Sequence, residues 1–186
     1  MTRRDMGEFL DPHDRRPVRV WDPLVRLAHW GLVICVVLNA WVLEEGELAH
    51  RRVGYAACTL VLVRGIWGIV GTRHARFSSF FPTPARLQHQ LQAMQRGQVQ
   101  AYVGHSPLGA VMMLALMGLV LLLGLTGWMQ VLDAFFGDEW LEELHKGVAN
   151  TLLACAGLHA MAALVLGRLE RVALVRAMVT GIKQQH

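Results

Sequence analysis

Four long apolar blocks constrain the fold more than any other feature of this sequence. They cover residues 27–43, 53–72, 107–132 and 147–167. A helix needs roughly 20 apolar residues to cross about 30 Å of hydrocarbon. Only 17% of the residues are charged, whereas a soluble domain carries about a quarter. We therefore predict an all-α integral membrane four-helix bundle, a single domain over residues 1–186 with spans at about 23–43, 53–72, 107–132 and 144–167.

The basic residues indicate how these spans are oriented. Lys and Arg in short connections stay on the cytoplasmic side of a membrane. Most of the 18 Lys and Arg residues fall in three regions that four spans place on one side: Arg3, Arg4, Arg15, Arg16, Arg19 and Arg26, then Arg73, Arg76, Arg86 and Arg96, then Arg168, Arg171, Arg176 and Lys183. The other two connections are acidic. We predict that both termini are cytoplasmic and that the chain is a multi-pass protein of the bacterial inner membrane.

The distribution of charge and cysteine excludes several classes of protein. The basic residues flank apolar blocks instead of forming one stripe, so the expected surroundings are membrane lipid and not nucleic acid. Cys35, Cys58 and Cys155 lie far apart inside apolar blocks. With no C-x-x-C-H motif, covalent c-type haem attachment is not expected, nor is a disulfide framework.

Two further helices are predicted at the cytoplasmic side. Thr83 followed by Pro84 is typical of a helix start, with Thr as the N-cap and Pro at the first helical position. Apolar residues then recur at helical spacing, which predicts a short helix on the membrane surface. Apolar residues also recur after Arg168, and we expect them to continue the fourth span.

Histidines inside the spans carry the main chemical signal, because ionisable residues in a bilayer are costly and rare. His145 and His159 are separated by 14 positions, which is about 21 Å along a helix and about 40° short of four full turns. Both therefore lie on one helix face at two depths. His50 begins the second span level with His145, and His29 lies in the first span level with His159.

Two histidine pairs at two depths suit two flat cofactors stacked in a bundle core. A haem iron takes axial ligands from both faces of the ring, and imidazole is a common choice. We predict that His29, His50, His145 and His159 are iron ligands of two non-covalent haem b groups. The alternatives are that each histidine is a hydrogen-bonded packing residue, or that the chain is a metal-ion carrier. The spans lack Asp and Glu, which weakens the carrier hypothesis.

Other polar residues at the span ends could serve these cofactors. Arg64 follows His50 by 14 positions and returns to the same face, where its guanidinium could bind a haem propionate. Snorkelling or pairing with another side chain is the alternative for Arg64. Arg51, with Arg52 and Lys146, could bind the outer haem in the same way.

His105 and Ser106 precede the third span at its cytoplasmic end. They could donate hydrogen bonds to a quinone head group there. Two alternatives stay open for His105. It could bind the inner haem in place of His29, or it could be a polar residue at the helix start that faces water.

Several motifs surround these residues: VRLAHW at His29, HRRVGY at His50, LVRGIWGIVG at Arg64, LHKGVAN at His145 and LHAMAAL at His159. They resemble the bacterial dihaem cytochrome b561 family, which is related to the b-type cytochrome subunits of nickel-iron hydrogenases and formate dehydrogenases. GHSPLGA at the third span is a looser match. The resemblance implies a four-helix bundle, two haem b groups, quinone as redox partner and the same pairing of histidines.

We therefore expect electron transfer between the quinone pool and a redox partner, such as a soluble cytochrome or a dehydrogenase subunit. The acidic outer connections could dock a basic partner. An alternative is that the chain acts alone as a quinol/superoxide oxidoreductase, with Arg51, Arg52 and Lys146 attracting the anion. Whether the chain forms a homodimer is left open by its sequence.

Overall fold

Four long helices form the body of the protein. The computed structural model describes residues 17–98 and 101–184. The long helices are α1 (Pro23–Trp41), α2 (Leu48–Val70), α5 (Pro107–Met129) and α6 (Glu139–Leu169). Each is long and apolar enough to cross a membrane, which confirms the predicted four-helix membrane bundle. Four of the basic residues used for the orientation, Arg3, Arg4, Arg15 and Arg16, lie outside the described residues.

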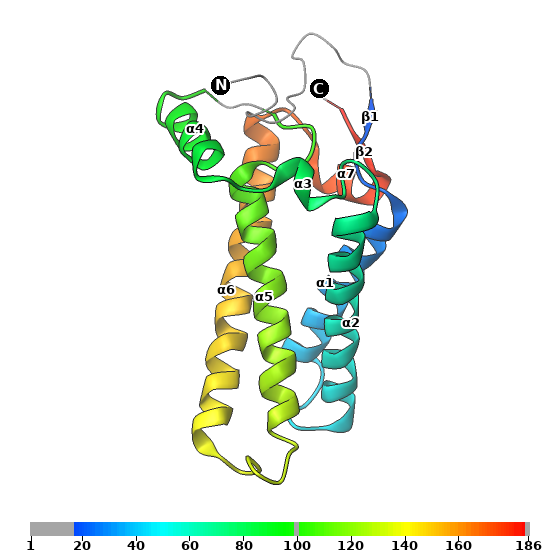
Figure 1. Cartoon of the computed structure of the whole chain (residues 1–186), viewed down its shortest axis with the longest axis vertical. Helices are drawn as coiled ribbons and strands as arrows, with labels where there is room; N and C mark the ends of the chain where they lie inside the picture. Colours follow the sequence, from blue (N-terminus) through cyan, green and yellow to red (C-terminus); the bar gives the residue numbers. More distant parts are fainter. Residues whose placement is uncertain (1–16, 99–100, 185–186) are drawn as a thin grey trace.

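The helices are arranged as two antiparallel pairs. Helix α1 packs along α2, α5 packs along α6, and α2 joins the pairs by packing against α5. The connections at residues 42–47 and 130–138 lie together at what we call the hairpin end, at the bottom of Figure 1. Helices α2 and α6 begin earlier than the predicted spans, so His50 and His145 both lie inside helices.

The opposite end, which we call the terminal end, carries the short elements. These are β1 (Val18–Arg19), α3 (Phe77–Phe80), α4 (Pro84–Gln95), α7 (Leu174–Thr180) and β2 (Ile182–Lys183). Strands β1 and β2 pair antiparallel, with Val18 opposite Lys183. The first and last described segments therefore lie at the same end of the bundle, as an even number of spans requires.

Helix α4 confirms that a short helix begins at Thr83 and Pro84, as predicted. The side chain of Thr83 accepts a hydrogen bond from the Arg86 amide at 3.4 Å, as an N-cap does. Gln90 is buried on the inner face of α4, and its Oε1 accepts a hydrogen bond from the Leu108 amide at 2.9 Å. Because Leu108 lies in the first turn of α5, this bond fixes the surface helix to the start of a span.

The predicted continuation of the fourth span is wrong. Helix α6 ends at Leu169, and the chain turns before α7 begins at Leu174. Arg171 adopts a left-handed conformation with φ of 53°, which a helix cannot accommodate. Val172 then becomes buried, 1% exposed. Burial of this side chain and the turn at Arg171 direct α7 back across the bundle toward α1.

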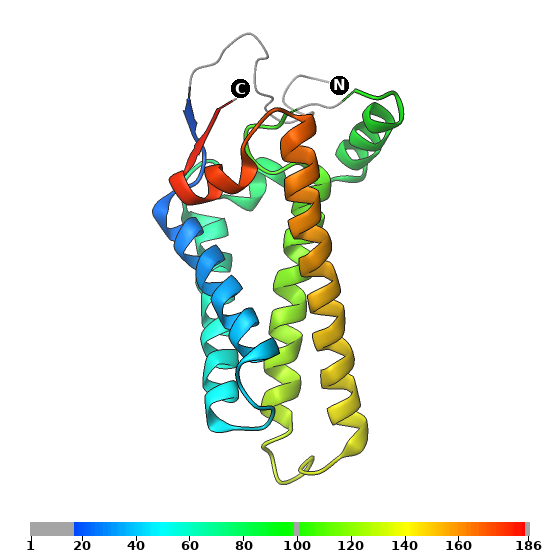
Figure 2. The ribbon, with the colours of Figure 1, turned by 180° about the vertical axis from the view of Figure 1, so that it is seen from behind.

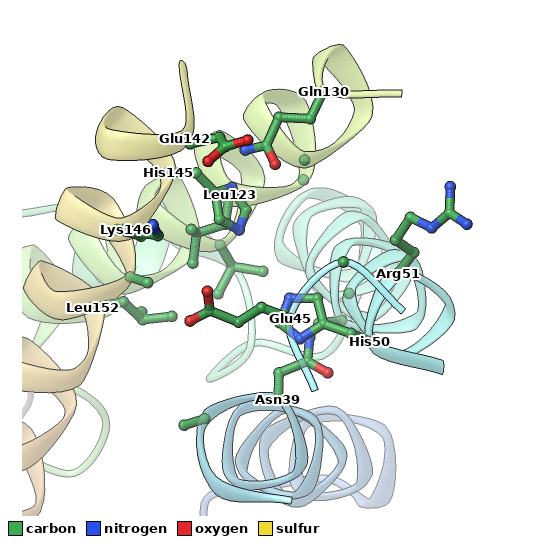
Figure 3. A pocket seen from close by; sticks show the side chains of 18 of the residues that line it. Asn39, Glu45, His50, Arg51, Leu123, Gln130, Glu142, His145, Lys146 and Leu152 are labelled. Carbon is green, nitrogen blue, oxygen red and sulfur yellow. The ribbon is translucent and has the colours of Figure 1, made fainter. Parts of the chain in front are cut away.

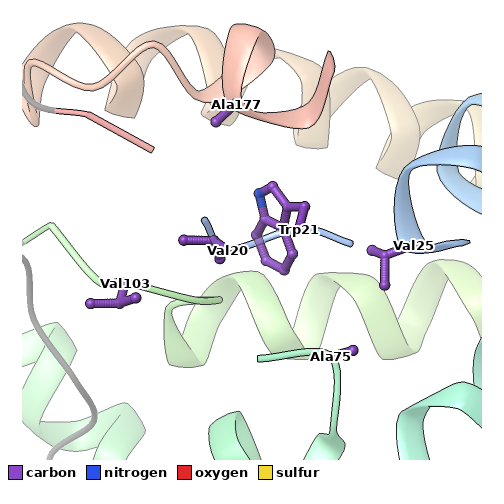
Figure 4. Packing of buried hydrophobic residues seen from close by; sticks show 6 residues of the cluster. All are labelled: Val20, Trp21, Val25, Ala75, Val103 and Ala177. Atoms are coloured by element: carbon purple, nitrogen blue, oxygen red, sulfur yellow. The ribbon is translucent and has the colours of Figure 1, made fainter. Parts of the chain in front are cut away.

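A buried apolar cluster closes the terminal end. It contains Val20, Trp21, Val25, Ala75, Val103 and Ala177, which come from four separate stretches of the chain (Figure 4). A second cluster, Ala57, Val61, Val120 and Leu152, joins α2, α5 and α6 in the middle of the bundle. Most other large apolar side chains on the long helices are exposed, as expected of surfaces that face lipid.

Asp22 links the start of α1 to the end of α2. Its Oδ1 accepts a hydrogen bond from the Val25 amide at 2.9 Å, and its Oδ2 accepts from Trp67 Nε1 and Thr72 Oγ1, each at 2.8 Å. Burial raises the pKa of Asp22, but these hydrogen bonds outweigh burial and lower it below 3.8. The stabilisation is therefore complete above the unfolded pKa and is lost as the pH falls through the lower folded pKa.

We predict that Asp22→Ala lowers the free energy of unfolding by about 2–3 kcal/mol, because it removes an N-cap and leaves two side-chain donors without an acceptor. Glu47→Ala is the matched control, since Glu47 is the exposed N-cap residue of α2 and its side chain makes no capping bond. It should change stability by less than about 0.5 kcal/mol. Unfolding in detergent, followed by circular dichroism, measures both. Equal effects would contradict the role given to Asp22.

Candidate functional site

Both predicted histidine pairs come together between the long helices. His29 of α1 faces His159 of α6, with ring centroids 6.4 Å apart and ring planes inclined by 55°. His50 of α2 and His145 of α6 line one cavity at the hairpin end (Figure 3). Helix α6 contributes one histidine to each pair, about 21 Å apart at 1.5 Å per residue. The fold thus provides two histidine sites at two depths.

The spacing of the terminal-end pair suits a shared metal ion. An imidazole nitrogen binds a transition metal at about 2 Å, which places the centres of two opposed rings about 6 Å apart. The observed separation of His29 and His159 is 6.4 Å. Nδ1 of His29 is buried and has no hydrogen-bond partner among the described residues. The pair therefore has the donor atoms and the separation that a bis-histidine iron site requires.

Arg64 is buried inside the terminal half of the bundle, with 5% of its surface exposed. Its guanidinium carbon lies 5.2 Å from the centre of the Phe77 ring, and Nη2 lies 3.9 Å from Met113 Sδ. Gly68, one turn later, has no side chain, which lets the Phe77 ring pack against α2. Nη1 is buried and has no partner within residues 17–98 and 101–184. Arg64 thus keeps a donor available for an anion inside the bundle.

His105 lies near the terminal-end pair, in which the rings of His29 and His159 face each other. Its ring contacts those of Trp21 and Phe80, with centroids 4.6 Å apart in each case. Nδ1 is buried without a partner among the described residues. Burial, followed by the positive charges of Arg64, Lys183 and the two paired histidines, lowers the pKa of His105 to about 3. The imidazole is therefore neutral at physiological pH and can both donate and accept a hydrogen bond.

The segment that carries His105 is held from both sides. Ser106 is the N-cap of α5, and its Oγ accepts a hydrogen bond from the Gly109 amide at 3.1 Å. Lys183 of β2 donates from Nζ to the carbonyl oxygens of Tyr102 at 2.7 Å and Gly104 at 3.2 Å. Burial lowers the pKa of Lys183 to about 8. The C-terminal strand thus fixes the loop that positions His105.

The hairpin-end cavity has a volume of about 870 Å³ and is lined by all four long helices. Cofactor pockets in proteins typically have volumes of about 300–1,000 Å³. His50 Nδ1 is buried there without a partner in the described chain. Figure 3 shows both imidazoles directed into the cavity, together with the carboxylate of Glu45. The cavity therefore offers two imidazoles and enough space for a large planar ligand.

Arg51 also lines this cavity. From the sequence, its guanidinium is expected to bind the outer haem. Its guanidinium points away from His50 and His145 in Figure 3. Lys146 lies at the opposite side of the cavity, half-exposed and 3.8 Å from Glu143.

Thr126 and Gly127 of α5 are site residues that the sequence analysis did not identify. Thr126 Oγ1 lies 2.7 Å from His145 Nδ1. A Cβ atom on Gly127 would lie 3.3 Å from His145 Cε1, so this glycine makes room for the ring. Thr126 is the one hydroxyl residue within the otherwise apolar α5, and that feature could have drawn attention to it.

The comparisons with known proteins agree with this architecture. Residues 20–181 match the family model of prokaryotic cytochrome b561, so the match includes all four long helices and every histidine discussed above. Neither the curated proteins nor the solved structures include a significant match to the chain. The family consists of multi-pass membrane proteins that bind haem b and transfer electrons. We conclude that this chain belongs to the prokaryotic cytochrome b561 family and is a membrane b-type cytochrome.

Proposed function

We propose that the chain holds two haem b groups and transfers electrons between the quinone pool and a redox partner. The observation that carries this proposal is the pairing of histidines at two depths, with 6.4 Å between the ring centres of His29 and His159. His29 with His159 would hold one haem, and His50 with His145 the other. Each bound haem supplies a one-electron carrier. Arg64 would bind propionate at the terminal-end site, and Lys146 would do so at the other.

The quinone would bind at the terminal end, near His105 and Ser106. A quinone head group needs a hydrogen-bond donor and a proton partner close to the membrane surface. The neutral imidazole of His105 can supply the hydrogen bond, because its pKa of about 3 keeps it uncharged. Since that imidazole carries no extra proton at neutral pH, the protons for quinone reduction would come from water or from Lys183, whose pKa is about 8, and quinol oxidation would release its protons to water.

The orientation follows from the charges of the two ends. The terminal end carries Arg26, Arg73, Arg76, Arg86, Arg96, Arg168, Arg171, Arg176 and Lys183. We assign this end to the cytoplasm and the membrane to the bacterial inner membrane. The hairpin end would then face outward. Its surface is mainly acidic and would attract a basic redox partner such as a soluble cytochrome.

The hairpin end is less suited to the superoxide hypothesis. That hypothesis relied on the positive charges of Arg51, Arg52 and Lys146 to attract an anion. The same end carries more carboxylates than cations: Glu44, Glu45, Glu47, Asp133, Asp138, Glu139, Glu142 and Glu143. Such a surface repels an anion over distances of about 10 Å. Electron exchange with a basic partner is the better-supported function, and the family match favours it over metal-ion transport.

We predict that His159→Ala lowers the haem content from two per chain to one, because the terminal-end site loses an axial ligand. His145→Ala should remove the other haem instead. His89→Ala is the control, since His89 lies on the surface helix α4 and should leave both haems in place. The ratio of haem to protein after purification measures each outcome. Two haems in purified His159→Ala would refute the assignment.

A second prediction concerns quinone. His105→Phe keeps an aromatic ring between Trp21 and Phe80 but removes the hydrogen-bonding nitrogens, so it should slow haem reduction by quinol about tenfold, the effect of losing roughly 1.4 kcal/mol. Haem content should stay unchanged. Ser79→Ala, on the exposed side of α3, is the control. Stopped-flow absorbance at the Soret band gives the rates, and a wild-type rate in His105→Phe would exclude a quinone site at this residue.

A further inference from the structure

The hydrogen bonds around Thr126 determine which nitrogen of His145 carries a proton. Thr126 Oγ1 lies 2.9 Å from the Leu122 carbonyl oxygen and 3.2 Å from that of Leu123. A hydroxyl has one proton, and a carbonyl oxygen can only accept. With its proton directed to these carbonyls, the threonine presents a lone pair to His145 Nδ1, 2.7 Å away. His145 Nδ1 must then be the donor of that bond.

This arrangement fixes the tautomer of His145. A neutral imidazole has one protonated nitrogen, so a proton on Nδ1 leaves Nε2 with a free lone pair. Thr126 is 2% exposed, which keeps water from competing for the bond. Gly127 adds a steric constraint, because a Cβ there would lie 3.3 Å from His145 Cε1 and 3.8 Å from Nδ1. Gly127 thus limits the position of the His145 ring, and Thr126 determines that the ring proton is on Nδ1.

We propose that Thr126 and Gly127 form a seat that holds His145 as the Nδ1-protonated tautomer, with Nε2 free to bind a metal. The inference rests on the proposed haem at the His50–His145 site. Thr126 is then a positioning residue and does not touch the metal itself. An acceptor on the remote nitrogen makes an imidazole a more basic ligand, which favours the oxidised metal. His29 and His50 differ from His145 in this respect, because their Nδ1 atoms are buried without a hydrogen-bond partner among the described residues.

The test compares two substitutions that differ in the hydroxyl. Thr126→Val has nearly the same shape but no acceptor, whereas Thr126→Ser keeps the acceptor. In a redox titration of the full chain, Thr126→Val should shift one of the two haem potentials upward and leave the other unchanged. It should also weaken haem binding at that site by about 10–100-fold. Thr126→Ser should keep both wild-type potentials.

Thr59→Val is the matched control. Thr59 Oγ1 makes the same kind of bond within its own helix, to the Tyr55 carbonyl at 2.9 Å, but the residue is exposed and is not bonded to a histidine. This variant should keep both potentials. If Thr126→Val fails to fold, Gly127→Ala decides the question, because the added methyl group must displace the His145 ring and should alter the same single potential.

Two outcomes separate this inference from the proposed function. If the wild-type protein holds two haems, and folded Thr126→Val or Gly127→Ala leaves both potentials and the haem content unchanged, the seat is refuted and the haem assignment stands. If the wild-type protein holds no haem, or His145→Ala keeps the wild-type haem content, the assignment of a haem to the His50–His145 site is wrong, and the role proposed for Thr126 and Gly127 is wrong with it.

Discussion

The pairing of histidines across the bundle is the constraint on which the rest of the structure depends. An imidazole in a bilayer is costly unless it has a partner, and a histidine pair on opposite helices must keep those helices apart by a fixed distance. The packing meets both requirements. Helices α1 with α2 and α5 with α6 pack tightly, while His29 and His159 face each other across the two pairs with 6.4 Å between ring centres. The close contact of α2 with α5 holds the pairs together without closing the space between the histidines.

The terminal end explains how this spacing can persist. Here the start of α1 is bonded through Asp22 to the end of α2, and Arg26 Nη1 donates to the Val179 carbonyl at 2.9 Å, which joins α1 to α7. Lys183 in turn bonds to the loop before α5. The short elements of the terminal end thus form a common cap. Helices α1, α2 and α5 are bonded into this cap, α6 continues into it through α7, and the apolar cluster around Trp21 fills its centre.

The sequence predicted the features that follow from regular spacing and missed those that depend on contacts between distant segments. Helix periodicity and span length were enough to place His145 and His159 on one face and to match them with His50 and His29. The turn at Arg171 could not be foreseen, because the burial of Val172 that accompanies it depends on the folded cap. The direction of the Arg51 side chain and the bond from Thr126 to His145 likewise depend on how α2, α5 and α6 are rotated about their axes, which hydrophobic patterning does not specify in spans that are apolar on all sides.

The two histidine sites have different charged neighbours, and in the proposed arrangement this difference would make the two haem potentials unequal. The buried guanidinium of Arg64 and the ammonium of Lys183 favour the form of a nearby group that carries an extra electron, while the carboxylates of Asp22 and Glu170 at the same end reduce that effect. At the hairpin end, Glu45 projects into the cavity and Glu142 also lines it, and these carboxylates favour the electron-poor form. The contribution of Thr126 to the basicity of His145 acts in the same sense as the carboxylates. In the proposed arrangement, Arg64 at one end and the two carboxylates and the Thr126 bond at the other would together make the terminal-end site the one of higher potential, and Asp22 and Lys146 would make the difference smaller.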